Sequence, residues 1–106
     1  GDTTISENCM LDNLIHIAHN VEIGSNCIIA GQVGIAGSVK IGKNVSIGGQ
    51  VGVNGHIKIG NNVKIAAKSG IISDVDDNSI IGGYPAVLIK DWHRNTIFLK
   101  KSIKKK

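Results

Sequence analysis

The chain has 106 residues, which is enough for one domain, and it carries a formal net charge of +4. Apolar residues make up 42% of it and charged residues 19%, a composition that excludes an intrinsically disordered chain. No apolar run is long enough for a transmembrane helix, and no basic segment precedes an apolar stretch, so neither a membrane span nor a signal peptide is expected. The aromatic residues amount to 3% and all follow residue 83, so the core must be built from aliphatic side chains.

An aliphatic residue recurs at every sixth position over residues 5–71. A period of six matches neither the 3.6-residue turn of a helix nor the two-residue alternation of a strand. It is typical of a short strand followed by a turn, repeated many times, which is the hexapeptide β-helix. The residues at these positions are Ile5, Leu11, Ile17, Ile23, Ile29, Ile35, Ile41, Ile47, Val53, Ile59, Ile65 and Ile71.

A second period of 18 residues indicates that three hexads form one turn of the β-helix. The segments 24–26, 42–44 and 60–62 each begin with Gly and end with Asn. Asn tolerates the positive φ that a tight turn requires, so we expect a triangular cross-section with asparagines at its corners. Residues 5–76 then make four coils, whose strands stack in parallel about 4.8 Å apart. Because nothing caps the first coil, its strand edges and Ile side chains should be exposed.

The hexad period ends after Asp76. Residues 82–86 are typical of a turn, and the apolar spacing of three and four that follows predicts one amphipathic helix over residues 86–104. We therefore divide the chain into a β-helix, residues 1–83, and a C-terminal turn and basic helix, residues 84–106. Residues 90–106 contain seven cations and one acid, Asp91. This segment is either a solvated helix end or a docking surface for an acidic partner. Nucleic acid is not expected as a partner, because no aromatic residues interleave with the charges.

Two histidines and a glycine are expected along one outer edge of the triangle. His19 and His56 lie on the same side, two coils and one residue apart, which corresponds to about 10 Å. Gly37 lies between them, one coil above His19. The two histidines are either solvated turn residues or part of a site. At this separation they cannot ligate one metal ion within a chain, because Zn–N bonds are only about 2.0–2.1 Å long.

Two chains could each supply one histidine to a metal, as in the γ-class carbonic anhydrases. That class has a further histidine five residues after the second, and Asn61 occupies this position here, so no metal is expected. Residues 49–52 lack the Gly-Lys-Ser/Thr of a phosphate-binding loop. Cys9 and Cys27 occupy the same inward position on adjacent coils. They are expected to be core thiols, although a disulfide between them is geometrically conceivable.

The twelve hexads, followed by a Gly-x-Pro-Ala sequence and a helix, resemble the hexapeptide acyltransferases. Four segments make the resemblance more specific: residues 12–24 (DNLIHIAHNVEIG), 34–38 (GIAGS), 47–51 (IGGQV) and 54–56 (NGH). Over about residues 2–92 they resemble the UDP-3-O-(3-hydroxyacyl)glucosamine N-acyltransferases of lipid A biosynthesis. The sibling O-acyltransferases share an Ile-Ala-His element, but their C-terminal Gly-Asn-His-Ala-Thr-Pro motif is absent here.

This resemblance implies a left-handed parallel β-helix that assembles into a homotrimer, with active sites between neighbouring subunits. It implies the transfer of a 3-hydroxyacyl chain from acyl carrier protein to the 2-amine of a UDP-sugar, in the cytoplasm. No cofactor is expected, since the donor is the phosphopantetheine thioester of the carrier protein. Family members also carry an N-terminal uridine-binding domain and earlier coils that this sequence does not contain. A catalytically incomplete trimeric β-helix is therefore the alternative, and another hexapeptide acyltransferase is a more distant one.

The matching motifs also imply roles for individual residues. His19 is expected to be the general base, the backbone N–H of Gly37 the oxyanion donor, and His56 an auxiliary group near the thioester or the pantetheine. An outer wall with small residues such as Ala66, Ala67 and Gly70 is expected to take the acyl chain. The substrate-binding residues in the same site are expected to be Asp12, Asn13, His16 and Asn20.

Overall fold

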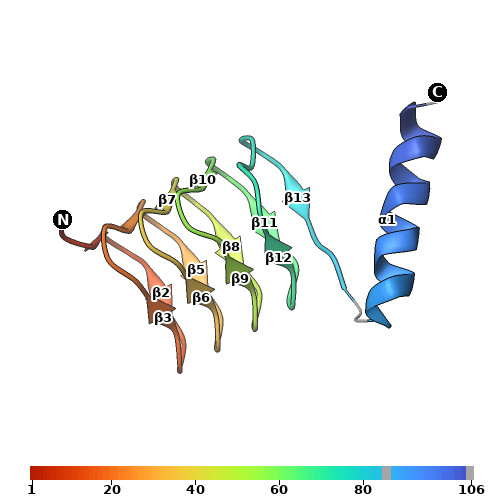
Figure 1. Cartoon of the computed structure of the whole chain (residues 1–106). Helices are drawn as coiled ribbons and strands as arrows, with labels where there is room; N and C mark the ends of the chain where they lie inside the picture. The colour runs from red at the N-terminus through yellow and green to blue at the C-terminus, as the bar shows by residue number, and fades with distance from the viewer. Residues whose placement is uncertain (85–86, 105–106) are drawn as a thin grey trace.

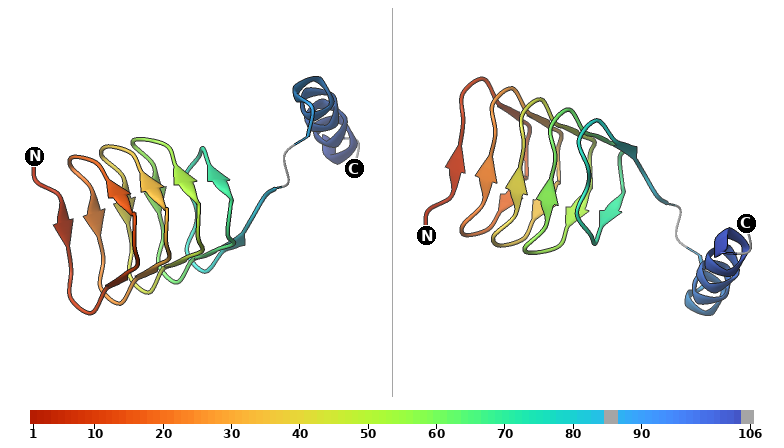
Figure 2. Two further views of the ribbon diagram at one scale, coloured as in Figure 1. Left: turned by 90° about the horizontal axis from the view of Figure 1, so that it is seen from below. Right: turned by 90° about the horizontal axis from the view of Figure 1, so that it is seen from above.

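The computed structural model describes residues 1–84 and 87–104, which form a parallel β-solenoid followed by one helix, α1 (Ile89–Lys104) (Figure 1). The described part measures 44 × 27 × 23 Å. The N-terminus lies at the first coil and α1 lies beyond the last one (Figure 2). The predicted helix was placed too early, because α1 begins at Ile89; Pro85 and Ala86, where the turn and the helix start were expected, lie outside the described residues.

Three parallel sheets form the three faces of the solenoid, and every strand is two residues long. Face A contains β1 (Thr4–Ile5), β4 (Glu22–Ile23), β7 (Lys40–Ile41) and β10 (Lys58–Ile59). Face B contains β2 (Met10–Leu11), β5 (Ile28–Ile29), β8 (Ser46–Ile47), β11 (Lys64–Ile65) and β13 (Ile80–Ile81). Face C contains β3 (His16–Ile17), β6 (Gly34–Ile35), β9 (Gly52–Val53) and β12 (Gly70–Ile71).

The pairing register confirms the predicted 18-residue coil. Ile5 pairs with Ile23 on face A, and Ile17 pairs with Ile35 on face C, one coil further along in each case. The aliphatic residue of each strand points inward, and the fourth residue after it also points inward. From Val21 to Ile71 these two positions are almost entirely buried, so the core is a stack of Ile and Val without an aromatic ring. As expected, the first coil is open, with Ile5 45% and Leu11 41% exposed.

The corners of the triangle depend on residues with positive φ. Asn8, Asn26, Asn44, Asn62 and Asn78 form one column of corners with φ near 60°, as the sequence predicted for asparagine. Side-chain hydrogen bonds of 3.1 Å join Asn44 to Asn62 and Asn62 to Asn78. The glycines of the solenoid are needed for a different reason than backbone conformation, because none of them has a positive φ. At Gly24, for example, an added Cβ would lie 2.5 Å from the carbonyl oxygen of Gly42, so the glycine permits close stacking of the coils.

The solenoid continues one strand further than predicted. β13 pairs with β11 in a register of 16 residues instead of 18, since Lys64 is opposite Ile80. The intervening segment is therefore two residues shorter than a full coil, which conceals the strand from a search for hexads. Ser69 takes an inward position where an aliphatic residue is usual. Its hydroxyl donates to the carbonyl of Ala66 at 2.6 Å and accepts from the N–H of Gly83 at 3.2 Å, which fixes the exit of the chain from the solenoid.

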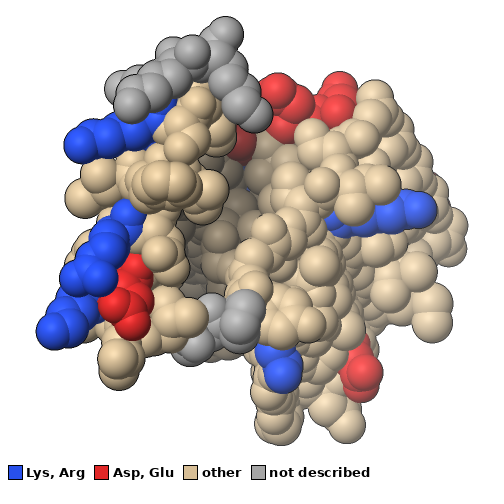
Figure 3. Space-filling model, turned by 90° about the vertical axis from the view of Figure 1, so that its right-hand side faces the viewer, with Lys and Arg blue, Asp and Glu red and all other residues tan. Residues whose placement is uncertain are grey.

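Helix α1 is amphipathic, as predicted, and makes no close backbone contact with any of the described strands. Its apolar side chains are at least half exposed, including Trp92 at 50% and Ile103 at 71%. Lys and Arg side chains gather on one side of the helix, and Asp side chains lie at the edge of the last coil (Figure 3). Within the residues described, no helix has the length and hydrophobicity that a membrane span requires.

Candidate functional site

The turns that follow the strands of face C carry His19, Gly37 and His56. We call this edge of the solenoid, formed by residues 18–20, 36–38 and 54–56, the C–A corner. All three residues belong to turns that directly follow β3, β6 and β9, so the repeat itself stacks them in one column. His19 and His56 are exposed and Gly37 is half-buried. The structure therefore brings together the three residues for which catalytic roles were predicted.

The imidazole of His19 lies directly against the Cα of Gly37. An added Cβ at Gly37 would lie 2.7 Å from both Cε1 and Nε2 of the ring, which no real side chain tolerates. Glycine is therefore the one residue that lets the ring occupy this place. Nδ1 of His19 is 3.3 Å from the side-chain nitrogen of Asn20, so the ring is held from its other side.

Backbone hydrogen bonds fix the loop around Gly37. The N–H of Ser38 donates to the carbonyl of His19 at 2.9 Å, and the N–H of His56 donates to the carbonyl of Gly37 at 3.0 Å. Among the described residues, no acceptor lies opposite the N–H of Gly37 itself. The C–A corner thus combines an exposed imidazole with an immobilised backbone N–H that has no acceptor among the described residues.

His16, one of the predicted substrate-binding residues, lies on face C, next to the C–A corner. It is the outward residue of β3, below Gly34 of β6. With Ala18, Gly34, Gly37 and Asn54, among others, it lines an open depression of about 550 Å³ on face C. Counting hexads from the aliphatic residues assigns His16 to the hexad that begins at Leu11, on the preceding side, whereas β3 already begins at His16.

Asp12 and Asn13 lie at a different corner of the triangle from His19. They follow β2, so they occupy the edge between faces B and C, which we call the B–C corner. The Asp12 carboxylate accepts the N–H of Asn13 at 2.7 Å. Face C separates this corner from the C–A corner, so within one chain the predicted substrate-binding residues are divided between two edges.

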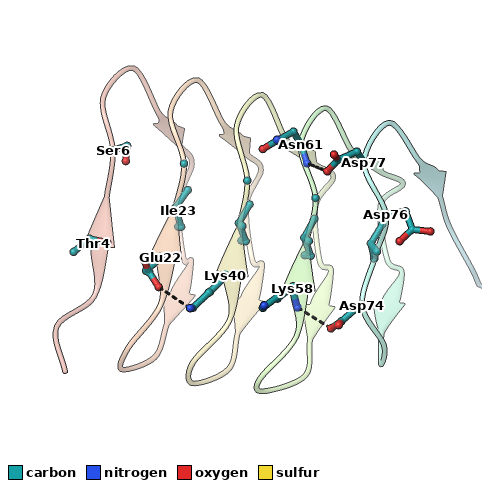
Figure 4. A pocket seen from close by; sticks show the side chains of 16 residues that line it. Thr4, Ser6, Glu22, Ile23, Lys40, Lys58, Asn61, Asp74, Asp76 and Asp77 are labelled. Atoms are coloured by element: carbon teal, nitrogen blue, oxygen red, sulfur yellow. Dashed lines mark hydrogen bonds and ion pairs between the residues drawn. The ribbon is translucent and has the colours of Figure 1, made fainter.

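Face A carries a larger depression, of about 850 Å³, whose lining is charged (Figure 4). Four of its charged side chains are already engaged with the chain itself. Glu22 and Lys40 form an ion pair at 3.6 Å, and both residues are well exposed. The Asp74 carboxylate accepts the N–H of Lys58 at 2.9 Å, and that of Asp77 accepts the N–H of Asn61 at 2.7 Å. Asp74 and Asp77 thus cap backbone N–H groups of the neighbouring coil, so their positions are explained without a bound ligand.

The two cysteines are free, and Cys27 is buried. Each thiol donates to a glycine carbonyl of the next coil at 3.2 Å, Cys9 to Gly24 and Cys27 to Gly42. Burial raises the pKa of the Cys27 thiol, so it is a neutral core group, as expected. The described residues bring no group of three or more His, Cys, Asp or Glu side chains together in a way that could hold a metal ion.

Sequence reasoning named only one of the outward glycines of face C, Gly70, and missed the column to which it belongs. Gly34, Gly52 and Gly70 stack in register, and an added Cβ at any of them would meet nothing within 4 Å. A signal was present, since glycine precedes the inward aliphatic residue three times at intervals of 18. The contact between Asn20 and His19 was also missed, because adjacency in sequence does not reveal which way two side chains turn.

The comparisons with known proteins agree with this architecture. The family model described as "Bacterial transferase hexapeptide (six repeats)" matches residues 2–37 and 38–73, which confirms the expected left-handed hexapeptide β-helix. A UDP-3-O-acylglucosamine N-acyltransferase of Caulobacter vibrioides is 54% identical over 101 residues, 95% of this chain and 30% of its own length. Proteins of the same name from Rickettsia akari and Legionella pneumophila are each 47% identical over 97% and 100% of this chain.

The chain spans about 30% of the length of these relatives. Among solved structures, the Neisseria gonorrhoeae serine acetyltransferase in complex with serine is 31% identical, with a TM-score of 0.59. The match covers 76% of this chain and 39% of that one. The Entamoeba histolytica serine acetyltransferase isoform 3, at 24% identity and a TM-score of 0.61, shares the fold.

Proposed function

Because the chain belongs to the bacterial transferase hexapeptide family, we propose that it is the catalytic β-helix of a UDP-3-O-acylglucosamine N-acyltransferase. The reaction moves a 3-hydroxyacyl chain from a carrier-protein thioester to the 2-amine of the sugar. The observation that carries this proposal is the C–A corner, where the His19 ring rests on Gly37 beside a backbone N–H for which the described part of the chain offers no acceptor.

The chemistry requires a base for the amine and a donor for the oxyanion. As the amine nitrogen attacks the thioester carbonyl, a C–N bond forms, and His19 takes the proton that the nitrogen loses. The carbonyl oxygen becomes an oxyanion, which the N–H of Gly37 stabilises by a hydrogen bond. When the C–S bond breaks, the thiolate of the pantetheine leaves and receives the proton from His19. No metal or redox step is needed for this balance.

Asn20 determines which nitrogen of His19 can act as the base. The amide nitrogen of Asn20 faces Nδ1 at 3.3 Å. Rotation of the amide presents its oxygen instead, and an Nδ1–H donated to this oxygen leaves the lone pair on Nε2, the nitrogen that lies over Gly37. In this role Asn20 is a positioning residue. His56 holds the carbonyl of Gly37 through its own N–H, and its exposed ring is left for the pantetheine arm.

A homotrimer completes the site. Asp12 and Asn13 lie at the B–C corner, so they can join His19 in one site only when they come from a neighbouring subunit. Cyclic symmetry pairs unlike edges of adjacent chains, which is the arrangement required here. Acyl carrier protein is the proposed acidic partner of the basic face of α1, and the UDP-sugar is the acceptor.

The test is acyl transfer from 3-hydroxyacyl carrier protein to a UDP-3-O-acylglucosamine, in the native protein that carries this chain. His19→Ala should reduce kcat about 10²–10⁴-fold, the usual range for loss of a general base. His56→Ala should reduce kcat less, because the His56 ring is expected to contact the pantetheine arm of the acyl donor and takes no proton. His16→Ala should reduce kcat least. Trimer mass serves as the check on folding. Near-normal turnover of His19→Ala would refute the mechanism, and no transfer by the wild type would favour a catalytically incomplete β-helix.

A further inference from the structure

Four residues occupy the same position in successive turns of the B–C corner, and each has a positive φ: Leu14, Gln32, Gln50 and Lys68. The backbone N–H groups of the last three donate to the turn of the preceding coil at 2.8–3.0 Å, so the residues form a column. The Gln50 side chain also donates to that of Gln32 at 2.8 Å. Lys68 ends the column on the side of α1, and these four turns, all of them described by the structure, contain no other cation. The corner therefore presents one positive charge, at its C-terminal end.

The ammonium of Lys68 is oriented but not neutralised. Its Nζ lies 5.9 Å from the centre of the Tyr84 ring, a contact that directs the side chain and leaves its charge in place. In the part of the chain that the structure describes, no carboxylate forms an ion pair with it, and the residue is exposed. The φ of 66° is also one that asparagine adopts more readily than lysine does. The fold alone thus does not account for a lysine at this turn, whereas an anionic ligand would.

Lys68 lies on the route from α1 to the proposed active site. In the proposed trimer the B–C corner of one subunit faces the C–A corner of the next, and with the three-fold axis along the solenoids, equal coils lie at equal heights. The 31 residues from Gly37 to Lys68 then correspond to about 8 Å of rise across the subunit boundary. Helix α1, the proposed surface for acyl carrier protein, lies further in the same direction, beyond the last coil (Figure 2). A donor arm that reaches from α1 to Gly37 must therefore pass the level of Lys68.

The distance fits one particular anion, the phosphate of phosphopantetheine. About 13 bonds join its thioester sulfur to its phosphorus, so the arm spans at most roughly 16 Å at about 1.2 Å per bond. With the thioester at Gly37, a rise of about 8 Å and a lysine side chain of about 6 Å place the ammonium within this span. We propose that Lys68 of the neighbouring subunit binds this phosphate and thereby selects the acyl donor. The inference rests on the proposed function, which supplies the trimer and the thioester.

Phosphate also occurs in the acceptor, as the diphosphate of the UDP-sugar. Lys68 lies at the C-terminal end of the B–C corner, whereas Asp12 and Asn13, the proposed substrate-binding residues, lie at its N-terminal end. The glutamines between them also suit the donor, because their side-chain amides can pair with the two amide groups of the pantetheine arm. The order of groups along the corner thus follows the order of groups in the donor arm.

Two donors that differ only in the phosphate test this role, the 3-hydroxydodecanoyl thioesters of 4′-phosphopantetheine and of pantetheine. Neither carries a carrier protein, so docking on α1 does not contribute. Their binding to the native protein that carries this chain is measured by calorimetry, without a sugar acceptor. The wild type should bind the phosphorylated donor about tenfold more tightly, because a hydrogen bond from an ammonium to a phosphate is charge-assisted. Salt at about 0.5 M should reduce this preference, since it screens exposed charges.

Lys68→Met removes the charge and keeps an unbranched side chain of similar length, so the turn should fold as before. We expect its affinity for the phosphorylated donor to fall about tenfold, to that for the pantetheine donor, which should not change. In transfer assays the KM for the phosphorylated donor should rise by the same factor, with kcat unaffected. Lys68→Arg retains the charge and should keep most of the preference. Lys64→Met is the matched control, because Lys64 is an exposed cation of the same coil on face B.

The outcomes separate this inference from the proposed function. A wild type without a preference, a preference that Lys68→Met leaves intact, or an equal loss of affinity for both donors would overturn the role of Lys68, even if acyl transfer is normal. If Lys68→Met weakens binding of UDP and leaves the donor preference unchanged, the anion is the diphosphate of the acceptor and the assignment to the donor is wrong. A phosphate preference that depends on Lys68, in a protein without transferase activity, would support the donor site and refute only the reaction.

Discussion

Twelve residues other than glycine adopt a positive φ near 60° in the turns of the β-helix, and six of them are asparagine. Asparagine is tolerated there because its short polar side chain can hydrogen-bond locally, whereas most residues pay about 1–2 kcal/mol. The exceptions are therefore informative. His56 and Ser38 have this conformation at the C–A corner, and Leu14 has it at the B–C corner. The two corners that carry the proposed site are thus the ones at which the asparagine rule is broken.

The contact between Gly37 and His19 leads to a sharp prediction. In Gly37→Ala the new methyl group would collide with Cε1 and Nε2, so the ring must swing away from the oxyanion donor. We expect kcat to fall about 10²–10⁴-fold with the fold intact, the range for loss of a general base, because the displaced ring no longer reaches the amine. Gly49→Ala is the matched control at the equivalent turn position, because its Cβ would meet only the carbonyl of Gly31 at 3.4 Å.

Turnover and circular dichroism of the two alanine variants are compared side by side. Equal activity of Gly37→Ala and Gly49→Ala would contradict the role of the His19 ring as a base in the position that the structure shows.

At the scale of the element, the hexads predicted nearly all of the solenoid, because each inward aliphatic residue is both the local signal and the core contact. The strand β13 was missed since a segment two residues short breaks the period. The residues of the C–A corner could be predicted because an 18-residue period converts sequence spacing directly into stacking. The column of outward glycines on face C was predicted only in part, because glycine gives no hydrophobic signal: Gly70 was expected in the wall for the acyl chain, whereas Gly34 and Gly52 were not.

The basic side chains of α1 lead to a prediction about the acidic partner. The double variant Lys100→Glu with Lys101→Glu should weaken binding of acyl carrier protein roughly tenfold at low ionic strength, because exposed cations mainly accelerate encounter. Salt should reduce the difference, since screening acts within about 10 Å at 0.1 M. Lys43→Glu, an exposed cation on the solenoid, is the control and should change affinity little. Equal affinities of all three proteins at low salt would remove α1 as the docking surface.

At the scale of the whole molecule, the three faces differ in what they expose. Face A is charged, whereas face B, the B–C corner and the C-terminal end of face C carry uncovered apolar side chains, among them Met10 at 68%, Leu14 at 78% and Ile72 at 78%. A chain of this size buries a limited core, so association along these faces would add substantially to its stability. These apolar surfaces also border the B–C and C–A corners, between which the predicted site residues are divided.

Leu14→Asn separates folding from assembly. Asparagine suits a φ of 60° better than leucine does, so the isolated chain should become slightly more stable, by about 1 kcal/mol. At the same time the B–C corner loses its exposed apolar side chain, and the trimer should dissociate at higher protein concentration than the wild type. Sedimentation should detect a species of three 11.1 kDa chains for the wild type at micromolar concentration. A wild type that sediments only as single chains would contradict the trimer.

The central claim is that one active site combines His19 of one subunit with Asp12 of its neighbour, and mixed trimers test it most directly. His19→Ala removes the proposed base and Asp12→Ala removes a proposed substrate contact, so each variant alone should transfer slowly, and the two variants are co-expressed in equal amounts. Since each site draws its two halves from different chains, about a quarter of all the sites in the co-expressed trimers should be intact, which corresponds to one site in each trimer that contains both variants. We predict that acyl transfer returns to about a quarter of the wild-type rate. Transfer that stays at the level of the single variants would show that the site is not shared between subunits.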